Sequence, residues 1–370
     1  MKTCFIFSTR PEIIKFASLI QLFSKNKENF FIINTMQHYD DLLSKIFFNA
    51  LKIKKPKYNL INNQKSSSTA FFSKSLNAIE KILIKEKPDN LIIQGDTNTS
   101  LVGAIAGQFF NRNSHLHKKQ IKIIHLEAGL RSYDKTMPEE INRQIIDQIS
   151  DVLLVPTQFD YKNLKKENLI KEKEVYVTGN TITDIIKTSL RKITNNKILQ
   201  TLKIDKKKYY LVTIHRPENT NSLKKLKEII LNLNKIGKIN NMDIVFPAHL
   251  RTIKQINRLK IKKLEKIKII NPLSYYDFLK LEKESKIIIT DSGGIQEEAS
   301  ILKVPCITIR KNTERQITIQ KKLNILSNTT YRKLISCVKI MNKKKIKDLK
   351  LFGDGKVAQK VYKKIILDRK

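Results

Sequence analysis

The chain has 370 residues, 41% of them hydrophobic, and 72 Lys and Arg against 34 Asp and Glu give a formal net charge of +38. This length exceeds what one hydrophobic core usually supports and predicts two domains. No apolar run approaches the ~18 residues of a membrane span, so we expect no membrane insertion. The lysines form many short, separate runs without an arginine cluster or interleaved aromatic residues, which argues against specific nucleic-acid binding.

Three cysteines, Cys4, Cys306 and Cys337, lack the spacing of metal ligands and are typical of small core residues in a reducing compartment. The first apolar run is too short for a signal peptide. We therefore expect a cytoplasmic protein without a metal. A basic nucleic-acid-binding protein remains the non-enzyme alternative, and it predicts retention on heparin with a steep salt dependence.

Short β-branched runs alternate with longer amphipathic stretches along the whole chain. The predicted strands are residues 3–7, 31–34, 90–94, 122–125, 152–155 and 175–178, then 210–214, 243–246, 268–270, 286–290 and 306–309. This alternation is typical of parallel sheets covered by helices on both faces. The sequence thus predicts an α/β protein with two Rossmann-like, doubly wound domains, residues 1–180 and 181–355. Ligands of such sheets bind beyond the carboxyl ends of the strands, so we expect a ligand in a cleft between the domains.

The loop after the first predicted strand carries two cations. Pro11 suits a helix start, and Ser8 or Thr9 suits the cap before it. Arg10 places a cation at the positive end of a helix, which favours a bound anion, and Lys15 follows about one turn later. The alternative is ordinary surface charge.

Carboxylates follow two later strands of the first domain. Asp96 precedes a predicted helix and could simply cap it. Glu127 directly follows an apolar strand, where an unpaired carboxylate is costly unless it serves a site. Glu139 lies in the first turn after Pro138, and Arg143 lies four residues further along the same helix face, a spacing also common in structural ion pairs.

The second domain has two comparable loops. His215 ends a strand, although a single histidine is more often structural. Ser292, Gly293 and Gly294 connect a strand to a helix, a geometry that seats a phosphate on free backbone amides. Glu298 lies one turn into that helix, where a carboxylate could accept hydrogen bonds from a diol. An ordinary strand-to-helix turn is the alternative.

Dinucleotide and P-loop fingerprints are both missing. No G-x-G-x-x-G follows a predicted strand, and ten glycines in the whole chain leave little room for one. We therefore expect no cofactor.

Seven ordered motifs resemble the non-hydrolysing UDP-N-acetylglucosamine 2-epimerases. They are T-R-P-E-x-I-K, G-D-T-x-T, H-x-E-A-G-L-R-S, P-E-E-x-N-R, V-T-G-N-T, H-R-x-E-N and T-D-S-G-G-I-Q-E-E. The resemblance extends from Phe5 to about Gly355. It implies the glycosyltransferase-B fold, with helix 356–370 packing back on the first domain, a UDP-sugar substrate and a homodimer. It also implies interconversion of UDP-N-acetylglucosamine and UDP-N-acetylmannosamine, supplying precursors of surface polysaccharides.

The resemblance also assigns roles to individual residues. The implied catalytic residues are Asp96, Glu127, Glu139 and His215. The implied substrate-binding residues are Arg10, Lys15, Arg143, Phe278, Ser292, Gly293, Gly294, Glu298 and Arg315, with Phe278 at the uracil and Glu298 at the ribose. Which carboxylate removes the sugar proton stays open.

Two departures from the family pattern concern regulation. Pro217 stands where many bacterial members carry a second arginine, and Tyr39 likewise replaces an arginine. Both positions belong to a second, regulatory substrate site in those relatives. The alternatives for the reaction are a 2-epimerase of UDP-2,3-diacetamido-2,3-dideoxyglucuronate, a hydrolysing epimerase and a glycosyltransferase of the same fold.

Overall fold

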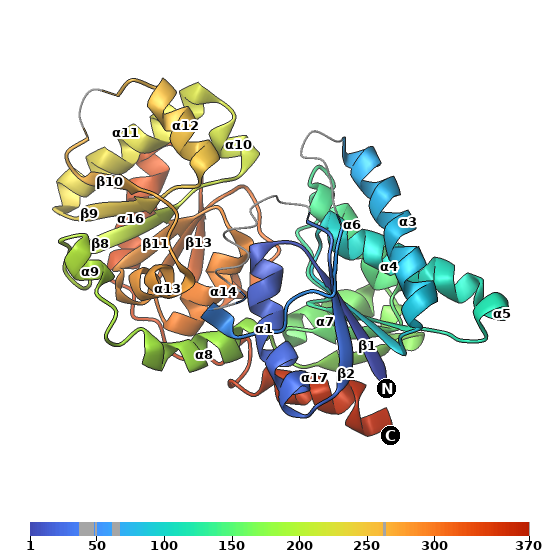
Figure 1. Ribbon diagram of the computed structural model, residues 1–370. Helices are drawn as coiled ribbons and strands as arrows, with labels where there is room; N and C mark the ends of the chain where they lie inside the picture. The colour runs from blue at the N-terminus through green and yellow to red at the C-terminus, as the bar shows by residue number, and fades with distance from the viewer. Residues whose placement is uncertain (37–47, 49, 61–66, 262–263, 370) are drawn as a thin grey trace. The chain divides into compact units, whose positions relative to one another are not determined.

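The computed structural model describes residues 1–36, 48, 50–60, 67–261 and 264–369 (Figure 1). The chain divides into two compact units. Unit 1 comprises residues 1–185 and 351–370, and unit 2 comprises residues 186–350. No helix among the described residues is both long and apolar enough to cross a membrane. Tyr39, one of the two departures noted above, lies outside the described residues.

Unit 1 contains seven parallel strands among its described residues, in the order β3-β2-β1-β4-β5-β6-β7. The strands are β1 (Lys2–Phe7), β2 (Asn29–Asn34), β3 (Tyr58–Asn59), β4 (Asn90–Gln94), β5 (Lys122–Leu126), β6 (Val152–Val155) and β7 (Glu174–Val177). The helices are α1 (Arg10–Lys25), α3 (Ser68–Glu86), α4 (Asn98–Arg112), α5 (Ser114–His117), α6 (Pro138–Ile149), α7 (Gln158–Lys166), α17 (Val357–Ile365), and the 3-10 turns η1 (Leu169–Lys171) and η2 (Leu367–Arg369).

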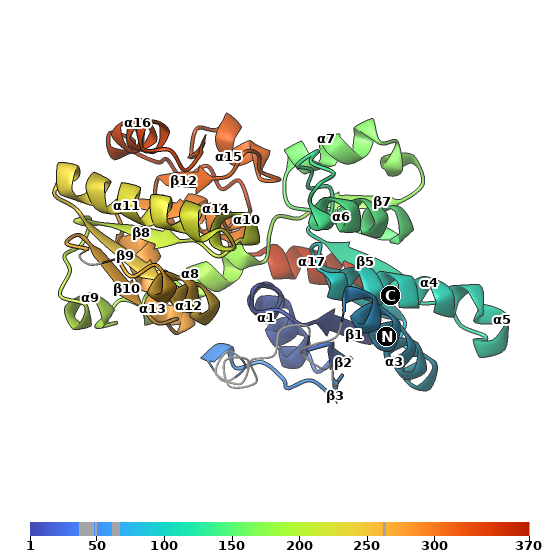
Figure 2. The ribbon, with the colours of Figure 1, turned by 90° about the horizontal axis from the view of Figure 1, so that it is seen from above.

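Both faces of this sheet are covered by helices, as the apolar centres of its strands require. Helices α3, α4 and α6 pack on the face that Cys4 and Ile6 of β1 present. On the other face, Phe5 meets Phe16 and Phe23 of α1 edge to face, with ring centroids 5.5 and 5.2 Å apart. The C-terminal helix α17 packs against α1 in this same layer (Figure 2).

Unit 2 repeats the plan with six parallel strands, counting its described residues, in the order β10-β9-β8-β11-β12-β13. The strands are β8 (Tyr209–Thr213), β9 (Asp243–Pro247), β10 (Ile267–Ile270), β11 (Ile287–Thr290), β12 (Cys306–Ile309) and β13 (Asn324–Ser327). The helices are α9 (Ile198–Thr201), α10 (Pro217–Thr220), α11 (Leu223–Asn240), α12 (Leu250–Arg258), α13 (Tyr275–Glu284), α14 (Gly293–Leu302), α15 (Gln316–Gln320) and α16 (Tyr331–Asn342), and α8 (Ile182–Lys192) connects the two units.

Alternate residues of β8 point to opposite layers of unit 2. Tyr210 and Val212 pack with α11, α12 and α16, whereas Tyr209 and Leu211 pack with α9, α13 and α14. All eleven predicted strands are confirmed to within two residues at each end, and the two-sheet α/β class is confirmed with them. Strands β3 and β13 were not predicted. β3 has only two residues, and β13 lacks a β-branched run because Asn324 and Ser327 enclose only Ile325 and Leu326.

The two places where the chain passes between the units are tied together within unit 1. Asn180 N donates to the Phe352 carbonyl over 2.8 Å, and Asp184 accepts from the first amides of α17, 3.0 Å from Val357 N and 2.7 Å from Ala358 N. Gly179 has φ +98°, and a Cβ there would lie 2.8 Å from the Phe352 oxygen. Only glycine fits without strain at position 179, where the chain passes from one unit to the other.

Candidate active site

Each sheet reverses its strand order at one place, between β1 and β4 in unit 1 and between β8 and β11 in unit 2. The loops that follow these strands are where doubly wound sheets bind ligands. These strands are followed by α1, which contains the predicted Arg10 and Lys15, and by the loops that contain the predicted Asp96, His215 and Ser292. The topology therefore gives each unit one predicted ligand-binding edge.

In unit 1, Glu127 lies at this edge and is held by two side chains. Lys15 Nζ of α1 and Gln94 Nε2 of β4 both donate to Glu127 Oε2. The ion pair is buried, with side chains of Lys15 and Glu127 9% and 4% exposed. Glu127 also has φ +70°, a left-handed conformation that costs of order 1–3 kcal/mol for a residue with a side chain. The donors from Lys15 and Gln94 hold the carboxylate in place at the end of β5.

The neighbouring loop is organised by Glu12, which the sequence analysis did not single out. Its Oε2 accepts from Ser8 N (3.0 Å) and Thr9 N (2.6 Å), and its Oε1 accepts from Thr97 Oγ1 of the β4 loop (2.7 Å). Burial raises the pKa of Glu12 above its ordinary value, and these hydrogen bonds oppose that rise. The spacing of Thr9 and Glu12 is the capping-box pattern, a signal that could have identified this residue.

Asp96 is not the cap of α4, whose N-cap is Thr97, and its carboxylate instead binds Arg143 of α6. Arg143 Nε and Nη2 both donate to Asp96 Oδ2, the first over 3.1 Å. Arg143 Nη1 also pairs with Glu140, which is fully buried. Glu139 is partly exposed in the first turn of α6. The carboxylate that holds Arg143 from within α6 is thus Glu140, at a spacing of three residues.

A second buried network, made of hydrogen bonds and ion pairs, holds the H-L-E-A-G-L-R segment in place. His125 Nδ1 lies 2.7 Å from Asp147 Oδ1, and its Nε2 lies 2.9 Å from the Gly95 carbonyl. Asp147 also accepts from Arg131 Nη1 at 2.7 Å. Burial would raise the pKa of Asp147, but the hydrogen bond from His125 and the charge of Arg131 hold it below its ordinary value. The network fixes the loop of Glu127 to that of Asp96.

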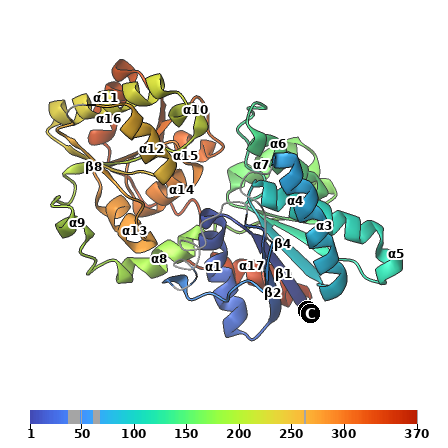
Figure 3. The same cartoon turned by 45° about the horizontal axis from the view of Figure 1, so that its top comes forward.

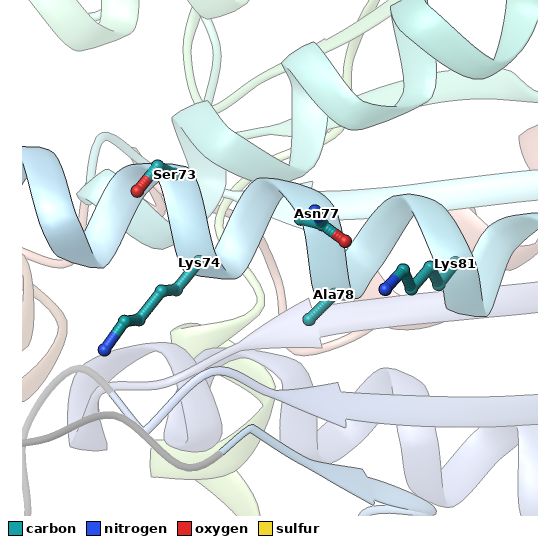
Figure 4. Close-up of a pocket in the computed structure, with 5 residues that line it drawn as sticks. All are labelled: Ser73, Lys74, Asn77, Ala78 and Lys81. Carbon is teal, nitrogen blue, oxygen red and sulfur yellow. The ribbon is translucent and has the colours of Figure 1, made fainter.

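Two hollows on the described part of unit 1 differ in their relation to the predicted residues. A small cavity of about 10 Å³, roughly the space of one water molecule, lies beside the Glu127 carboxylate. It is lined by Gln94, Leu126, Glu127, Gly179, Asn180 and Thr181. The larger hollow is an open depression along one face of α3, lined by Ser73, Lys74, Asn77, Ala78 and Lys81 (Figure 4). It contains none of the predicted residues, so we place the candidate site at Glu127.

In unit 2, a buried residue that was not predicted joins the two candidate loops. Thr213 and Thr290 are register partners at the ends of β8 and β11, with hydroxyl oxygens 2.6 Å apart. Asp291, 0% exposed, accepts from His215 N at 3.1 Å and from Arg216 N at 3.0 Å. The His215 side chain is 52% exposed, with Nδ1 3.5 Å from Asp291. His215 and the Ser292 turn therefore share one edge of unit 2.

Helix α14 begins at Gly293, two residues earlier than expected, with Ser292 as its N-cap. Arg315 lies against this helix start and is held by two carboxylates, 2.6 Å from Glu314 and 3.1 Å from Glu297. A Cβ on Gly293 would lie 2.3 Å from Glu314 Oε1, whereas one on Gly294 would meet nothing within 4 Å. The missing side chain at Gly293 thus leaves space for the ion pairs of Arg315. The missing side chain at Gly294 leaves the start of the helix uncovered.

The two glycines therefore predict different substitution effects. Gly293→Ala should lower the free energy of unfolding of unit 2 by about 1–3 kcal/mol, because the buried Glu314 and Arg315 have to move. Gly294→Ala should be neutral or stabilising by about 0.5–1 kcal/mol, since alanine replaces a helical glycine without a clash. Parallel urea titrations of the two variants measure the difference, and equal midpoints would contradict this account.

The remaining predicted residues have mixed environments. Arg10 is exposed at the start of α1, and Phe278 and Glu298 are partly exposed on α13 and α14. Lys15 and Arg315, both expected at a diphosphate, also bind carboxylates of their own unit. Their contacts with a substrate stay predictions.

A family model described as UDP-N-acetylglucosamine 2-epimerase matches residues 22–366. The chain belongs to this family. A UDP-N-acetylglucosamine 2-epimerase of Methanococcus maripaludis is 45% identical over 357 residues, covering 95% of this chain and 94% of the relative. The crystal structure of Methanocaldococcus jannaschii UDP-GlcNAc 2-epimerase, in complex with UDP-GlcNAc and UDP, covers 100% of both chains with a TM-score of 0.89 and 42% identity.

A third relative in this epimerase family has a different substrate in its name. The UDP-2,3-diacetamido-2,3-dideoxy-D-glucuronate 2-epimerase of Pseudomonas aeruginosa is 34% identical over 364 residues and covers 98% of both chains. This identity is lower than the 45% and 42% to the two methanogen proteins above, which are named for UDP-N-acetylglucosamine. The epimerase family is therefore established by the whole chain and not by a single motif.

Proposed function

We propose that the protein interconverts UDP-N-acetylglucosamine and UDP-N-acetylmannosamine by elimination and re-addition of UDP. Membership of the 2-epimerase family and 45% identity to a relative named for this activity support the proposal. The observation that carries it is the position of Glu127, a strained and buried carboxylate that follows β5, contacts Lys15 and Gln94, and lies beside a small cavity of unit 1.

The chemistry explains why carboxylates and cations are both needed. The hydrogen on sugar carbon 2 is not adjacent to a carbonyl, so its removal alone would leave an unstabilised carbanion. Breaking the bond from carbon 1 to the UDP oxygen as the proton leaves gives instead a double bond between carbons 1 and 2. Protonation of carbon 2 on the opposite face, with return of the UDP oxygen to carbon 1, completes the inversion. The steps need a base, an acid and stabilisation of the departing diphosphate.

In this proposal, as the family resemblance implies, residues of both units act on one substrate. Asp96, Glu127, Glu139 and His215 handle the protons, and Arg143 fixes the position of Asp96. The diphosphate is bound by Arg10, Lys15 and Arg315 together with the amides of the Ser292 turn, including Gly293 and Gly294. Phe278 contacts the uracil and Glu298 the ribose hydroxyls. The partly exposed His215 and Glu298 are accessible for these roles.

Incubation with UDP-N-acetylglucosamine in heavy water, followed by NMR, tests the reaction. We expect UDP-N-acetylmannosamine carrying deuterium at carbon 2, with the nucleotide sugar intact. Free N-acetylmannosamine and UDP would indicate a hydrolysing epimerase, and epimerised product without deuterium would contradict the elimination. Unchanged substrate, with turnover of the diacetamido uronate, would move the assignment to that sugar.

The assembly and the compartment are part of the proposal. By resemblance to its family we propose a homodimer in the cytoplasm. Light scattering on the purified protein would give the dimer mass of about twice 43.1 kDa, and the monomer mass would contradict it.

A further inference from the structure

One buried histidine of unit 1, His125, is not among the residues proposed to handle protons. It lies near the end of β5, two residues before Glu127, and its side chain is fully buried. Both nitrogens of its ring have partners. Nδ1 lies 2.7 Å from Asp147 Oδ1, and Nε2 lies 2.9 Å from the Gly95 carbonyl oxygen. Because the ring is enclosed, any part that His125 takes in the reaction has to act through these two partners.

Both partners of the His125 ring are acceptors. A backbone carbonyl can only accept, so Nε2 carries a proton and donates it to Gly95. Asp147 Oδ2 accepts from Arg131 Nη1 at 2.7 Å and from Gly129 N at 3.1 Å, as expected of an ionised carboxylate. Burial raises the pKa of such a group, yet the partners of Asp147 keep its pKa below the ordinary value. Nδ1 therefore donates as well, and the ring carries a proton on each side.

The charges around the ring agree with this arrangement. Arg131 donates to two carboxylates, the fully buried Asp147 and the partly exposed Glu167. One guanidinium group thus faces two anions. A buried carboxylate needs both compensating charge and hydrogen bonds, and a doubly protonated His125 supplies them to Asp147.

The bond from His125 to Gly95 fixes the backbone immediately before Asp96. Gly95 N donates to the Leu126 carbonyl over 3.0 Å, and the Gly95 carbonyl accepts from His125 Nε2. Gly95 has φ +69°, so the chain turns at this residue. Both backbone polar groups of Gly95 are thereby held on β5, the strand that Glu127 follows.

Helix α6 is part of the same arrangement. It lies beside α4, the helix that follows the Asp96 loop (Figure 3). Asp147 of α6 binds His125, and Arg143, one turn earlier on the same helix face, binds Asp96. Asn142 Nδ2 also donates to the Asp96 carbonyl over 3.0 Å. The helix that positions the Asp96 carboxylate is therefore itself fixed to β5 through His125.

We propose that His125 is a positioning residue of the epimerase reaction, whose ring donates to Gly95 and to Asp147 and so holds Asp96 in place relative to Glu127. The inference rests on the proposed function through the roles of these two carboxylates. A displacement of about 1 Å between groups that act on one substrate can lower its rate about 10²-fold. Disturbing His125 should therefore lower kcat, whereas KM and UDP affinity, which depend on the nucleotide contacts, should change little.

Three substitutions in the full-length protein separate the two hydrogen bonds of the ring. His125→Gln places an amide N–H near the position of Nε2 and keeps the bond to Gly95. His125→Asn places one near the position of Nδ1 and keeps the bond to Asp147, and His125→Phe keeps a ring without a donor. We expect His125→Gln to retain kcat to within about fivefold and the other two to lose about 10²-fold. Deuterium exchange at carbon 2 should fall in parallel, with UDP affinity by calorimetry nearly unchanged.

A matched variant separates loss of positioning from loss of stability. Ile79→Ala removes a fully buried side chain of α3 and leaves a cavity in the core of the same unit. It should lower the urea midpoint but leave kcat of the folded protein unchanged. A loss of kcat in Ile79→Ala as large as in His125→Phe would show that activity follows stability alone, and the inference would fail.

The wild type offers a measurement that does not depend on how a variant folds. Nitrogen-15 NMR of protein labelled at its histidines distinguishes protonated from unprotonated ring nitrogens, and the signals of His125 are those that His125→Gln lacks. We expect both ring nitrogens of His125 to be protonated at neutral pH. An unprotonated Nε2 would contradict donation to Gly95 and overturn the inference.

The kinetic outcomes can contradict the inference separately from the proposed function. Equal losses of kcat in the Gln and Asn variants, or an unchanged kcat in all three, would overturn it. If the wild type epimerises UDP-N-acetylglucosamine with deuterium at carbon 2, such results refute this inference alone. If the wild type does not epimerise a UDP-sugar, the proposed function fails and the inference fails with it.

Discussion

Glu127→Gln is expected to lower epimerisation, and exchange of the carbon 2 proton with solvent, by about 10²–10⁴-fold, the usual contribution of a positioned acid or base. The amide has the same shape but cannot take up a proton at neutral pH. Its oxygen still accepts from Lys15 and Gln94, whose donors now converge on Glu127 Oε2. Deuterium incorporation in heavy water measures the loss, and calorimetry with UDP should show binding largely retained.

Two controls make this result specific to the site. Glu80→Gln changes a carboxylate on α3, away from the candidate site, and should leave exchange unchanged. Thermal unfolding of Glu127→Gln reveals any cost of leaving the buried Lys15 ammonium without a full counter-charge. Full exchange activity in a folded Glu127→Gln protein would end the assignment of Glu127, and Asp96 or His215 would then be the residues to test.

Asp291→Ala is the substitution for which we expect the largest loss of stability in unit 2, about 3 kcal/mol or more. Three donors converge on this carboxylate, from His215 N, Arg216 N and Asn219 Nδ2, the last at 3.0 Å. Each donor left buried without a partner costs about 1–3 kcal/mol. Release of the His215 loop from the Ser292 turn should also remove epimerase activity. Urea unfolding and the heavy-water assay measure the two effects.

The same loop offers a matched control. Glu218 lies in α10 with a side chain that is 55% exposed and 3.6 Å from Arg216, so Glu218→Ala should change stability by less than about 1 kcal/mol. Asp291→Asn keeps one oxygen with two lone pairs as an acceptor. Its loss of stability should therefore lie between those of Asp291→Ala and Glu218→Ala. A stable, active Asp291→Ala protein would show that the loop does not depend on this carboxylate.

Much of the architecture could be predicted because it depends on local pattern. The β-branched run at Ile287–Thr290 is fully buried as β11. Such runs can be recognised in a sequence because a strand with both faces covered is nearly continuously hydrophobic. Two predictions about local detail needed correction. α14 starts at Gly293 and not at Ile295, and Arg143 contacts Glu140 from within α6, because burial and not spacing alone selects the partner.

The sequence by itself determined the alternation of strands and helices, the positions of the polar loops at strand ends and the family. It did not determine which loops meet, because strand order is set by packing between segments far apart in the chain. Only the tertiary structure placed Glu12 against Thr97 and the Asp291 carboxylate against the backbone amide of His215. Each of these contacts joins a carboxyl group to a distant segment, and its energy depends on burial that no local pattern records.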